Sequence, residues 1–162
     1  MNARSAHTLE FRHTIEIAAD PSDVQAAFFD REALADWWQA ASSIATPRAL
    51  GAYAIEWEPT SFRDDVLGRL GGVFHGTVME VSGDRSFLIA DAWWLPPDGE
   101  PVGPMALHVT SMRAGGRTRL TVVQSGFDEG PRWRRYYEWI SQGWITSLET
   151  LRLRLERRRD DP

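Results

Sequence analysis

Alternating apolar and polar residues dominate the chain and predict a series of β-strands. Over residues 9–18 every second side chain points to an apolar face, a period of two that is typical of a half-buried strand. Residues 52–58 alternate in the same way, with Tyr53, Ile55 and Trp57 on one face. Two pairs of strand-like segments follow, and each pair is joined by a short turn that contains glycine. These segments are 73–81 with 86–94, and 105–112 with 118–125.

Helical signals flank the strands. Asp20 followed by Pro21 predicts the start of a short helix, because aspartate caps helices and proline suits the first helical position. Asp30 predicts the start of a second short helix that ends near Trp37 and Trp38. From Pro131 to about Arg158, apolar residues recur at spacings of three and four, which predicts one helix of about 28 residues and roughly 42 Å. Its apolar stripe comprises Trp133, Tyr137, Ile140, Trp144, Leu148, Leu151 and Leu155.

The order of these elements predicts an α+β fold. One strand, two short helices, five further strands and a long helix follow one another, and helices kept apart from a run of antiparallel strands are typical of this class. Residues 39–51 are expected to form a loop, and the glycine-rich stretch 59–72 a polar connection with room for one helical turn. We expect a single domain over residues 1–162, with its core at about 9–158.

Composition narrows the functional classes. The chain contains no cysteine, which excludes disulfides, thiolate metal sites and cysteine nucleophiles. All 18 basic residues are arginine, but they are scattered and the net charge is −5, so the basic surface that nucleic-acid binding requires is not expected. No apolar run reaches the length of a membrane span, and the N-terminus does not resemble a signal peptide, so we expect a cytoplasmic protein.

Tryptophan is the unusual feature of the composition. The chain has eight of them in 162 residues, and several fall in groups: Trp37 with Trp38, Trp93 with Trp94, and a set on the last helix. Tryptophan is large and is rarely buried completely, so such groups commonly line cavities and interfaces as well as filling cores.

Three stretches of sequence resemble the START/SRPBCC helix-grip superfamily, and within it the homologues of the activator of the Hsp90 ATPase. They are IEIAADPSDVQAAFFDREALADWW from Ile15, TRLTVVQSGF from Thr118, and GWITSLETLRLRLE from Gly143. The resemblance implies a helix-grip fold, in which a curved antiparallel sheet of six or so strands wraps around the C-terminal helix. It also implies a cavity between sheet and helix, where members of the superfamily bind lipids, sterols, hormones or polyketides. Some members cyclise polyketides or act as co-chaperones.

The inward face of the sheet can be assigned only provisionally, because both faces of the 73–94 hairpin are apolar. The register of the superfamily favours the face that carries Phe87, Ile89 and Trp93. This leaves Met79, Leu88 and Trp94 on an apolar outer face suited to a homodimer. We therefore predict that the following residues bind the ligand: Trp37, Trp38, Trp57, Phe74, Phe87, Ile89, Asp91, Trp93, Leu107, Val109, Leu120, Val122, Gln124, Tyr137, Ile140, Trp144 and Leu148.

Few residues suggest catalysis. Asp91 interrupts an apolar strand, and if it points inward it is a buried carboxylate that could act as a general acid or hold a polar ligand. His75 and His108 have no third ligand at metal spacing, so neither a metal nor another cofactor is expected. Gln124 stands where the superfamily often has a histidine.

The leading hypothesis is a protein that binds a small apolar or amphipathic molecule, lipid-like or of aromatic polyketide type. One alternative is a polyketide cyclase or hydrolase that uses Asp91, and another is a co-chaperone that stimulates the Hsp90 ATPase. No interaction with nucleic acid and no insertion into a membrane is expected.

Overall fold

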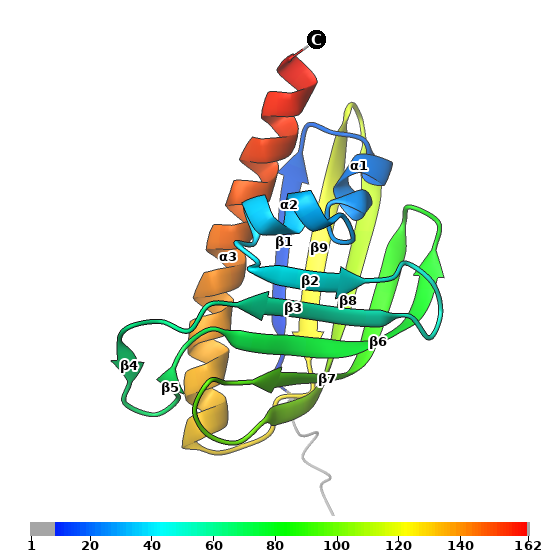
Figure 1. Cartoon of the computed structure of the whole chain (residues 1–162). Helices are drawn as coiled ribbons and strands as arrows, with labels where there is room; N and C mark the ends of the chain where they lie inside the picture. The colour runs from blue at the N-terminus through cyan, green and yellow to red at the C-terminus, as the bar shows by residue number, and fades with distance from the viewer. Residues whose placement is uncertain (1–8, 162) are drawn as a thin grey trace, which may run out of the picture.

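The computed structural model describes residues 9–161, so the predicted domain 1–162 extends past these residues at both ends. It confirms the α+β helix-grip fold: one antiparallel sheet of seven strands, a small two-stranded sheet, two short helices and one long helix (Figure 1). The elements are β1 (Phe11–Ile17), α1 (Pro21–Ala26), α2 (Arg31–Trp37), β2 (Ser42–Ala45), β3 (Ala52–Trp57), β4 (Arg63–Asp64), β5 (Gly68–Arg69), β6 (Gly72–Ser82), β7 (Ser86–Leu95), β8 (Val102–Ala114), β9 (Arg117–Ser125) and α3 (Pro131–Asp160).

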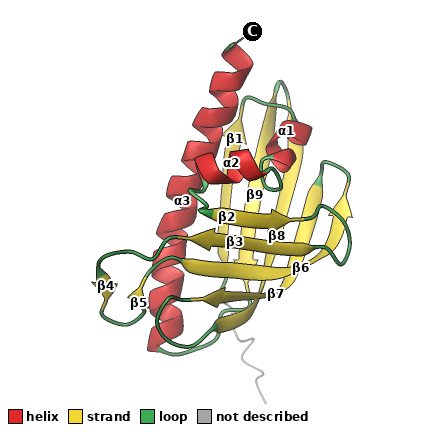
Figure 2. Cartoon of the chain, in the orientation of Figure 1, coloured by secondary structure: helices red, strands yellow, loops and turns green. Residues whose placement is uncertain are grey.

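The large sheet has the strand order β1-β9-β8-β7-β6-β3-β2. The long helix α3 runs along the sheet, and α1 and α2 cover the same side near the C-terminal end of α3, as the colouring by secondary structure in Figure 2 shows. The buried residues of α3 lie on one stripe, because spacings of three and four return to the same face of a helix. They are Tyr136, Trp144, Leu148, Leu151 and Leu155.

Aromatic side chains fill the space between the sheet and the two short helices. Phe28 lies edge-on to both Trp37 and Phe87, at ring-centroid distances of 5.0 and 5.4 Å. The buried polar tips of this cluster are satisfied, because the Trp37 indole donates to the carbonyl of Ala27 and the Tyr53 hydroxyl donates to that of Phe28. This half of the concave face is therefore solid core.

Two local predictions are wrong. Residues 39–51 do not form only a loop, since Ser42–Ala45 pairs with β3 as the edge strand β2. The side chain of Ile44 on this strand is 64% exposed, so the strand lacks the apolar alternation that would have identified it. The connection 59–72 contains no helical turn, because Arg63–Asp64 and Gly68–Arg69 pair as the short strands β4 and β5.

The predicted inward face is right for the first part of β7 and wrong for the second. Phe87 and Ile89 point inward and are buried, but the register shifts between Ile89 and Ala92, where Asp91 has a φ of 51°. A bulge adds a residue to one strand, and the residues after it then point to the opposite face. Trp94 therefore points inward and Trp93 outward, the reverse of the prediction.

Candidate functional site

A pocket of about 510 Å³ opens between the N-terminal half of α3 and the concave face of the sheet. Its walls come from α3, from the end of α2 and from strands that are remote in sequence. The lining residues are Trp38, Gln39, Ala41, Trp57, Glu58, Thr60, Phe62, Leu70, Gly71, Phe74, Trp94, Gln124, Tyr136, Trp139, Ile140, Gly143, Trp144 and Ser147. We call this the aromatic pocket.

Two groups of aromatic rings line the pocket. In the first group, Trp38 lies 4.8 Å from Trp144 and 5.3 Å from Trp57 between ring centroids. In the second, Trp94 lies 5.2 Å from both Tyr136 and Trp139, stacked on the former and tilted against the latter. Indole and phenol rings offer flat apolar surface with few rotatable bonds, so they make a rigid wall for an aromatic or apolar ligand.

Gln124 joins the two groups at the bottom of the pocket. It is buried on β9, where its Oε1 accepts a hydrogen bond from Trp144 Nε1 at 2.8 Å. Its Nε2 donates to the hydroxyl of Tyr136 at 3.2 Å and to Met105 Sδ at 3.3 Å. A buried amide is stable only when such partners are present, so Gln124 holds Tyr136 and Trp144 at a fixed distance from each other.

The β4–β5 hairpin borders the mouth of the pocket and is held by ion pairs. Asp64 accepts from Arg135 of α3 at 2.6 Å, and Asp98 accepts from Arg69 at 3.0 Å. The hydrogen bond from Arg135 lowers the pKa of Asp64 to about 2, and the hydrogen bond from Arg69 lowers the pKa of Asp98 to about 2. Both carboxylates are thus ionised at neutral pH, and the hairpin is tied to α3 and to the loop after β7.

The structure brings only part of the predicted site together. The residues of the predicted set that line the aromatic pocket are Trp38, Trp57, Phe74, Gln124, Ile140 and Trp144. Others are buried but belong to the packed core instead: Trp37, Phe87, Ile89, Leu107, Val109, Leu120, Val122 and Leu148. They face inward, but the short helices and neighbouring side chains already occupy the space in front of them.

Three predicted site residues lie outside the pocket. Asp91 is exposed and accepts a hydrogen bond from Trp93 Nε1 at 3.1 Å. The ring of Trp93 covers the backbone of Gly103, where a Cβ atom would come within 2.7 Å of it. The hydroxyl of Tyr137 is directed to the carbonyl of Glu10 at 3.4 Å. The expectation that Asp91 points inward, on which its catalytic role depended, is wrong because of the bulge.

Tyr136, Trp139 and Trp94 form one wall of the pocket and are not among the residues predicted from the sequence. Tyr136 and Tyr137 are adjacent, and the helical spacing from Ile140 favoured the second of them. The signal that could have found Tyr136 is the row of four-residue steps that it forms with Ile140 and Trp144, since residues four apart are neighbours on one side of a helix. Phe62 was missed because it lies in a connection without a regular pattern.

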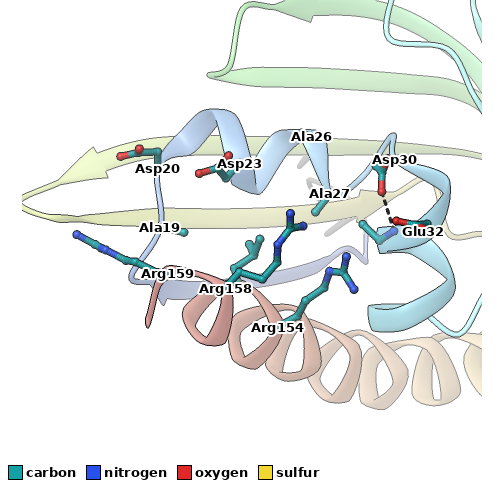
Figure 3. A pocket seen from close by; sticks show the side chains of 12 residues that line it. Ala19, Asp20, Asp23, Ala26, Ala27, Asp30, Glu32, Arg154, Arg158 and Arg159 are labelled. Carbon is teal, nitrogen blue, oxygen red and sulfur yellow. Dashed lines mark hydrogen bonds between the residues drawn. The ribbon is translucent and has the colours of Figure 1, made fainter. Parts of the chain in front are cut away.

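A second cavity, of about 560 Å³, lies where the end of α3 passes α1 and α2. Figure 3 shows arginines of α3 facing carboxylates of the two short helices. Arg154 forms an ion pair with Asp36 of α2, which links the two helices. The charged lining residues are Asp20, Asp23, Asp30 and Glu32 on the side of the short helices and Arg154, Arg158 and Arg159 on α3. With this charged lining the cavity does not resemble an apolar ligand site.

The sequence of residues 18–156 matches the family model of the Activator of Hsp90 ATPase homolog 1-like proteins. The chain belongs to this family. The match begins directly after β1 and runs through most of α3, so it includes every residue of the aromatic pocket. The resemblance noted in the sequence is thereby confirmed, and no curated protein sequence matches the chain.

Several solved structures share the fold of this family member. A protein of Chromobacterium violaceum is 24% identical, with a TM-score of 0.65 over 91% of this chain and 96% of its own. A Mycobacterium smegmatis protein is 16% identical, with a TM-score of 0.72 over 91% of each chain. The Aha1 dimer of Colwellia psychrerythraea is 15% identical, with a TM-score of 0.66 over 91% of this chain and 96% of that one. Within residues 9–161 no helix is long and apolar enough to cross a membrane.

Proposed function

We propose that this protein binds a small, largely apolar molecule, aromatic or lipid-like, in the aromatic pocket. The observation that carries the proposal is the pocket itself: about 510 Å³ lined by tryptophan, tyrosine and phenylalanine from elements that are remote in sequence. Ligand sites for small molecules commonly have volumes of about 300–1,000 Å³, an apolar lining and a few well-placed polar groups. Gln124 and Tyr136 are the buried polar groups here.

A ligand would enter between the β4–β5 hairpin and α3. The lining residues that are exposed to solvent, Gln39, Ala41, Glu58, Phe62 and Gly143, mark this mouth. Phe62 has 59% of its surface exposed although it is aromatic, which leaves an apolar ring at the entrance with no packing partner of its own in the core.

Tryptophan fluorescence tests the proposal directly, because Trp38, Trp57 and Trp144 line the pocket. The purified protein is titrated with a panel of fatty acids, sterols and naphthalene derivatives, and native mass spectrometry records any co-purified molecule. We expect saturable quenching by at least one member of the panel. Absence of quenching together with a ligand-free mass would contradict the proposal.

A matched pair of variants shows whether binding occurs in this pocket. A Cβ atom at Gly143 meets no atom within 4 Å, so Gly143→Phe can place a ring in the mouth and should weaken binding. Ile145→Phe adds a ring on the same helix at an exposed position that does not line the pocket, and it should bind as the unmodified protein does. Equal loss in both variants would place the ligand elsewhere.

Catalysis through Asp91 is not part of the proposal. A general acid or base must lie within hydrogen-bond reach of the substrate, whereas Asp91 is exposed and does not line the aromatic pocket.

Membership of the family supports a second candidate function, activation of the Hsp90 ATPase. The test is an ATPase assay with the chaperone of the same organism, at increasing concentrations of this protein. Stimulation that survives in Gly143→Phe would separate this activity from the pocket. A homodimer through the outer sheet face also stays a prediction, supported by the exposed Met79 and by the dimeric Colwellia psychrerythraea protein, and light scattering would measure it.

A further inference from the structure

The hydrogen bonds at the bottom of the aromatic pocket fix the direction of each proton. An indole nitrogen can only donate, so the atom of Gln124 that faces Trp144 at 2.8 Å must be the amide oxygen. The amide nitrogen of Gln124 therefore faces Tyr136, and both of its hydrogens have partners, the Tyr136 hydroxyl and Met105 Sδ. The orientation of the amide follows from the chemistry of Trp144 alone.

The hydroxyl of Tyr136 must accept the hydrogen bond from Gln124, which leaves its own proton to be donated elsewhere. Among residues 9–161 no side chain or carbonyl accepts this proton. Tyr136 is only 2% exposed, and burial raises the pKa of its phenol, so the proton is retained at physiological pH. A buried donor without an acceptor is unfavourable, and a ligand in the pocket can supply the missing acceptor.

The charge of the lining limits what that ligand can be. None of the residues that line the aromatic pocket is an arginine, lysine or histidine, and Glu58 at the mouth is the one carboxylate. An anionic group in this pocket would lose its hydration without meeting a cation, which is strongly unfavourable. The lining therefore favours a neutral group beside Tyr136.

From these observations we infer that the aromatic pocket selects an uncharged ligand whose carbonyl, ether or hydroxyl oxygen accepts the hydrogen bond of the Tyr136 hydroxyl. The inference rests on the proposed function, since it specifies the chemistry of the molecule that the pocket binds. It makes Tyr136 a determinant of specificity, with Gln124 orienting its hydroxyl.

Three naphthalene probes of similar shape separate the possibilities. They are 2-acetylnaphthalene, which carries a neutral oxygen acceptor, 2-ethylnaphthalene, which lacks it, and 2-naphthoate, which is anionic. Dissociation constants are measured by tryptophan fluorescence for the unmodified protein, Tyr136→Phe and Tyr137→Phe. Tyr137 is the matched control, because it is the neighbouring tyrosine and its hydroxyl is directed to the carbonyl of Glu10 outside the pocket.

The expected signature is a change in preference. Tyr136→Phe should reduce the affinity for the ketone relative to the ethyl compound by about three- to tenfold, the range that one neutral hydrogen bond provides. Tyr137→Phe should leave that ratio unchanged, and 2-naphthoate should bind more weakly than either neutral probe. A ratio that is the same in Tyr136→Phe as in the unmodified protein would overturn the inference.

An infrared measurement on the unmodified protein covers the case in which Tyr136→Phe does not fold. The carbonyl stretch of bound 2-acetylnaphthalene should lie at lower wavenumber than that of the same ketone in cyclohexane, because hydrogen bonding weakens the C=O bond. A carbonyl band at the cyclohexane position would overturn the inference and leave the proposed function standing. Binding of none of the three probes, and of none of the fatty acids and sterols either, would contradict the proposed function and, with it, the inference. Binding of fatty acids alone, which are anionic, would overturn the inference and leave the proposed function standing.

Discussion

At the scale of single residues, Gln124 is the residue that holds two aromatic side chains of the pocket in place by hydrogen bonds. It has partners on both sides, and its loss would leave the Trp144 indole and the Tyr136 hydroxyl without their buried hydrogen bonds. We expect Gln124→Leu to lower the free energy of unfolding by about 1–3 kcal/mol, the cost of unsatisfied buried polar groups. Urea unfolding measures this. Gln142→Leu on the exposed face of α3 is the control, with a change within about 0.5 kcal/mol.

Single residues also show why some side chains of the site could be predicted from the sequence and others could not. Trp57 and Trp144 lie at the pocket as their faces suggested, because the strand and helix that carry them are regular and their faces follow from periodicity, and their contact with a ligand stays a prediction. Trp93 and Trp94 were interchanged, because the bulge at Asp91 has no sequence signature as clear as glycine at a positive φ. One inserted residue changes the face of every residue after it, so a small local irregularity caused an error over half a strand.

At the scale of elements, replacing glycine by alanine should have opposite effects on stability in the long helix α3 and in the turn of the β6–β7 hairpin. Gly143 lies inside α3 and Gly83 lies in the hairpin turn with a φ of 56°, and at neither position would a Cβ atom meet anything within 4 Å. Gly143→Ala should stabilise the protein by about 1 kcal/mol through helix propensity, a rise in Tm of about 2–4 °C. Gly83→Ala should destabilise it by about 1 kcal/mol, since alanine disfavours a positive φ. Equal effects at the two positions would show that steric space decides and backbone conformation does not.

The ion pairs that hold the β4–β5 hairpin should make the free energy of unfolding depend on pH. The pKa values of Asp64 and Asp98 are lowered to about 2 in the folded protein, from a usual 3.8. The unfolded chain therefore binds more protons between these values, so the stabilisation is fully present above about pH 4 and is lost as the pH falls towards 2. Urea unfolding at pH 5 and pH 2.5 should show this loss, and Asp64→Asn or Asp98→Asn should make it smaller. Asp84→Asn, at an exposed turn, should leave the loss as it is.

Elements with a regular pattern of apolar residues could be predicted from the sequence, and elements without such a pattern could not. The long helix and the two hairpins of β6 to β9 follow from clear periods, and their presence agrees with the structure. The strands β2, β4 and β5 could not be predicted, because edge strands of two to four residues with exposed side chains bury no apolar face. The pocket-lining residues Ala41, Phe62 and Leu70 directly flank these short strands, so the entrance is the part of the site that the sequence predicts least.

At the scale of the whole molecule, the concave side of the sheet divides into a filled half and an open half. Phe28, Tyr53 and Phe87 fill the half under α1 and α2, whereas the half under the start of α3 contains the aromatic pocket. The composition of the two halves is similar, so the sequence could indicate aromatic residues on the concave side but not which of them would leave space between them. A cavity remains where the side chains do not fill the space that the backbone encloses. Periodicity shows which way a side chain points, but it gives neither the enclosed volume nor the volume that the side chains occupy.

This division predicts that ligand binding and stability can be separated at the pocket mouth. Because Phe62 lines the pocket but is 59% exposed, Phe62→Ala should change the free energy of unfolding by less than about 0.5 kcal/mol.

A ligand at 100 times its dissociation constant stabilises a folded protein by about 2.7 kcal/mol, which for a chain of this size raises Tm by about 5–10 °C. With 2-acetylnaphthalene as the ligand, Phe62→Ala should show a smaller rise at the same concentration. Met112→Ala, equally exposed on β8 and outside the pocket, should show the full rise. An undiminished rise in Phe62→Ala would mean that the bound ligand does not contact Phe62 at this mouth.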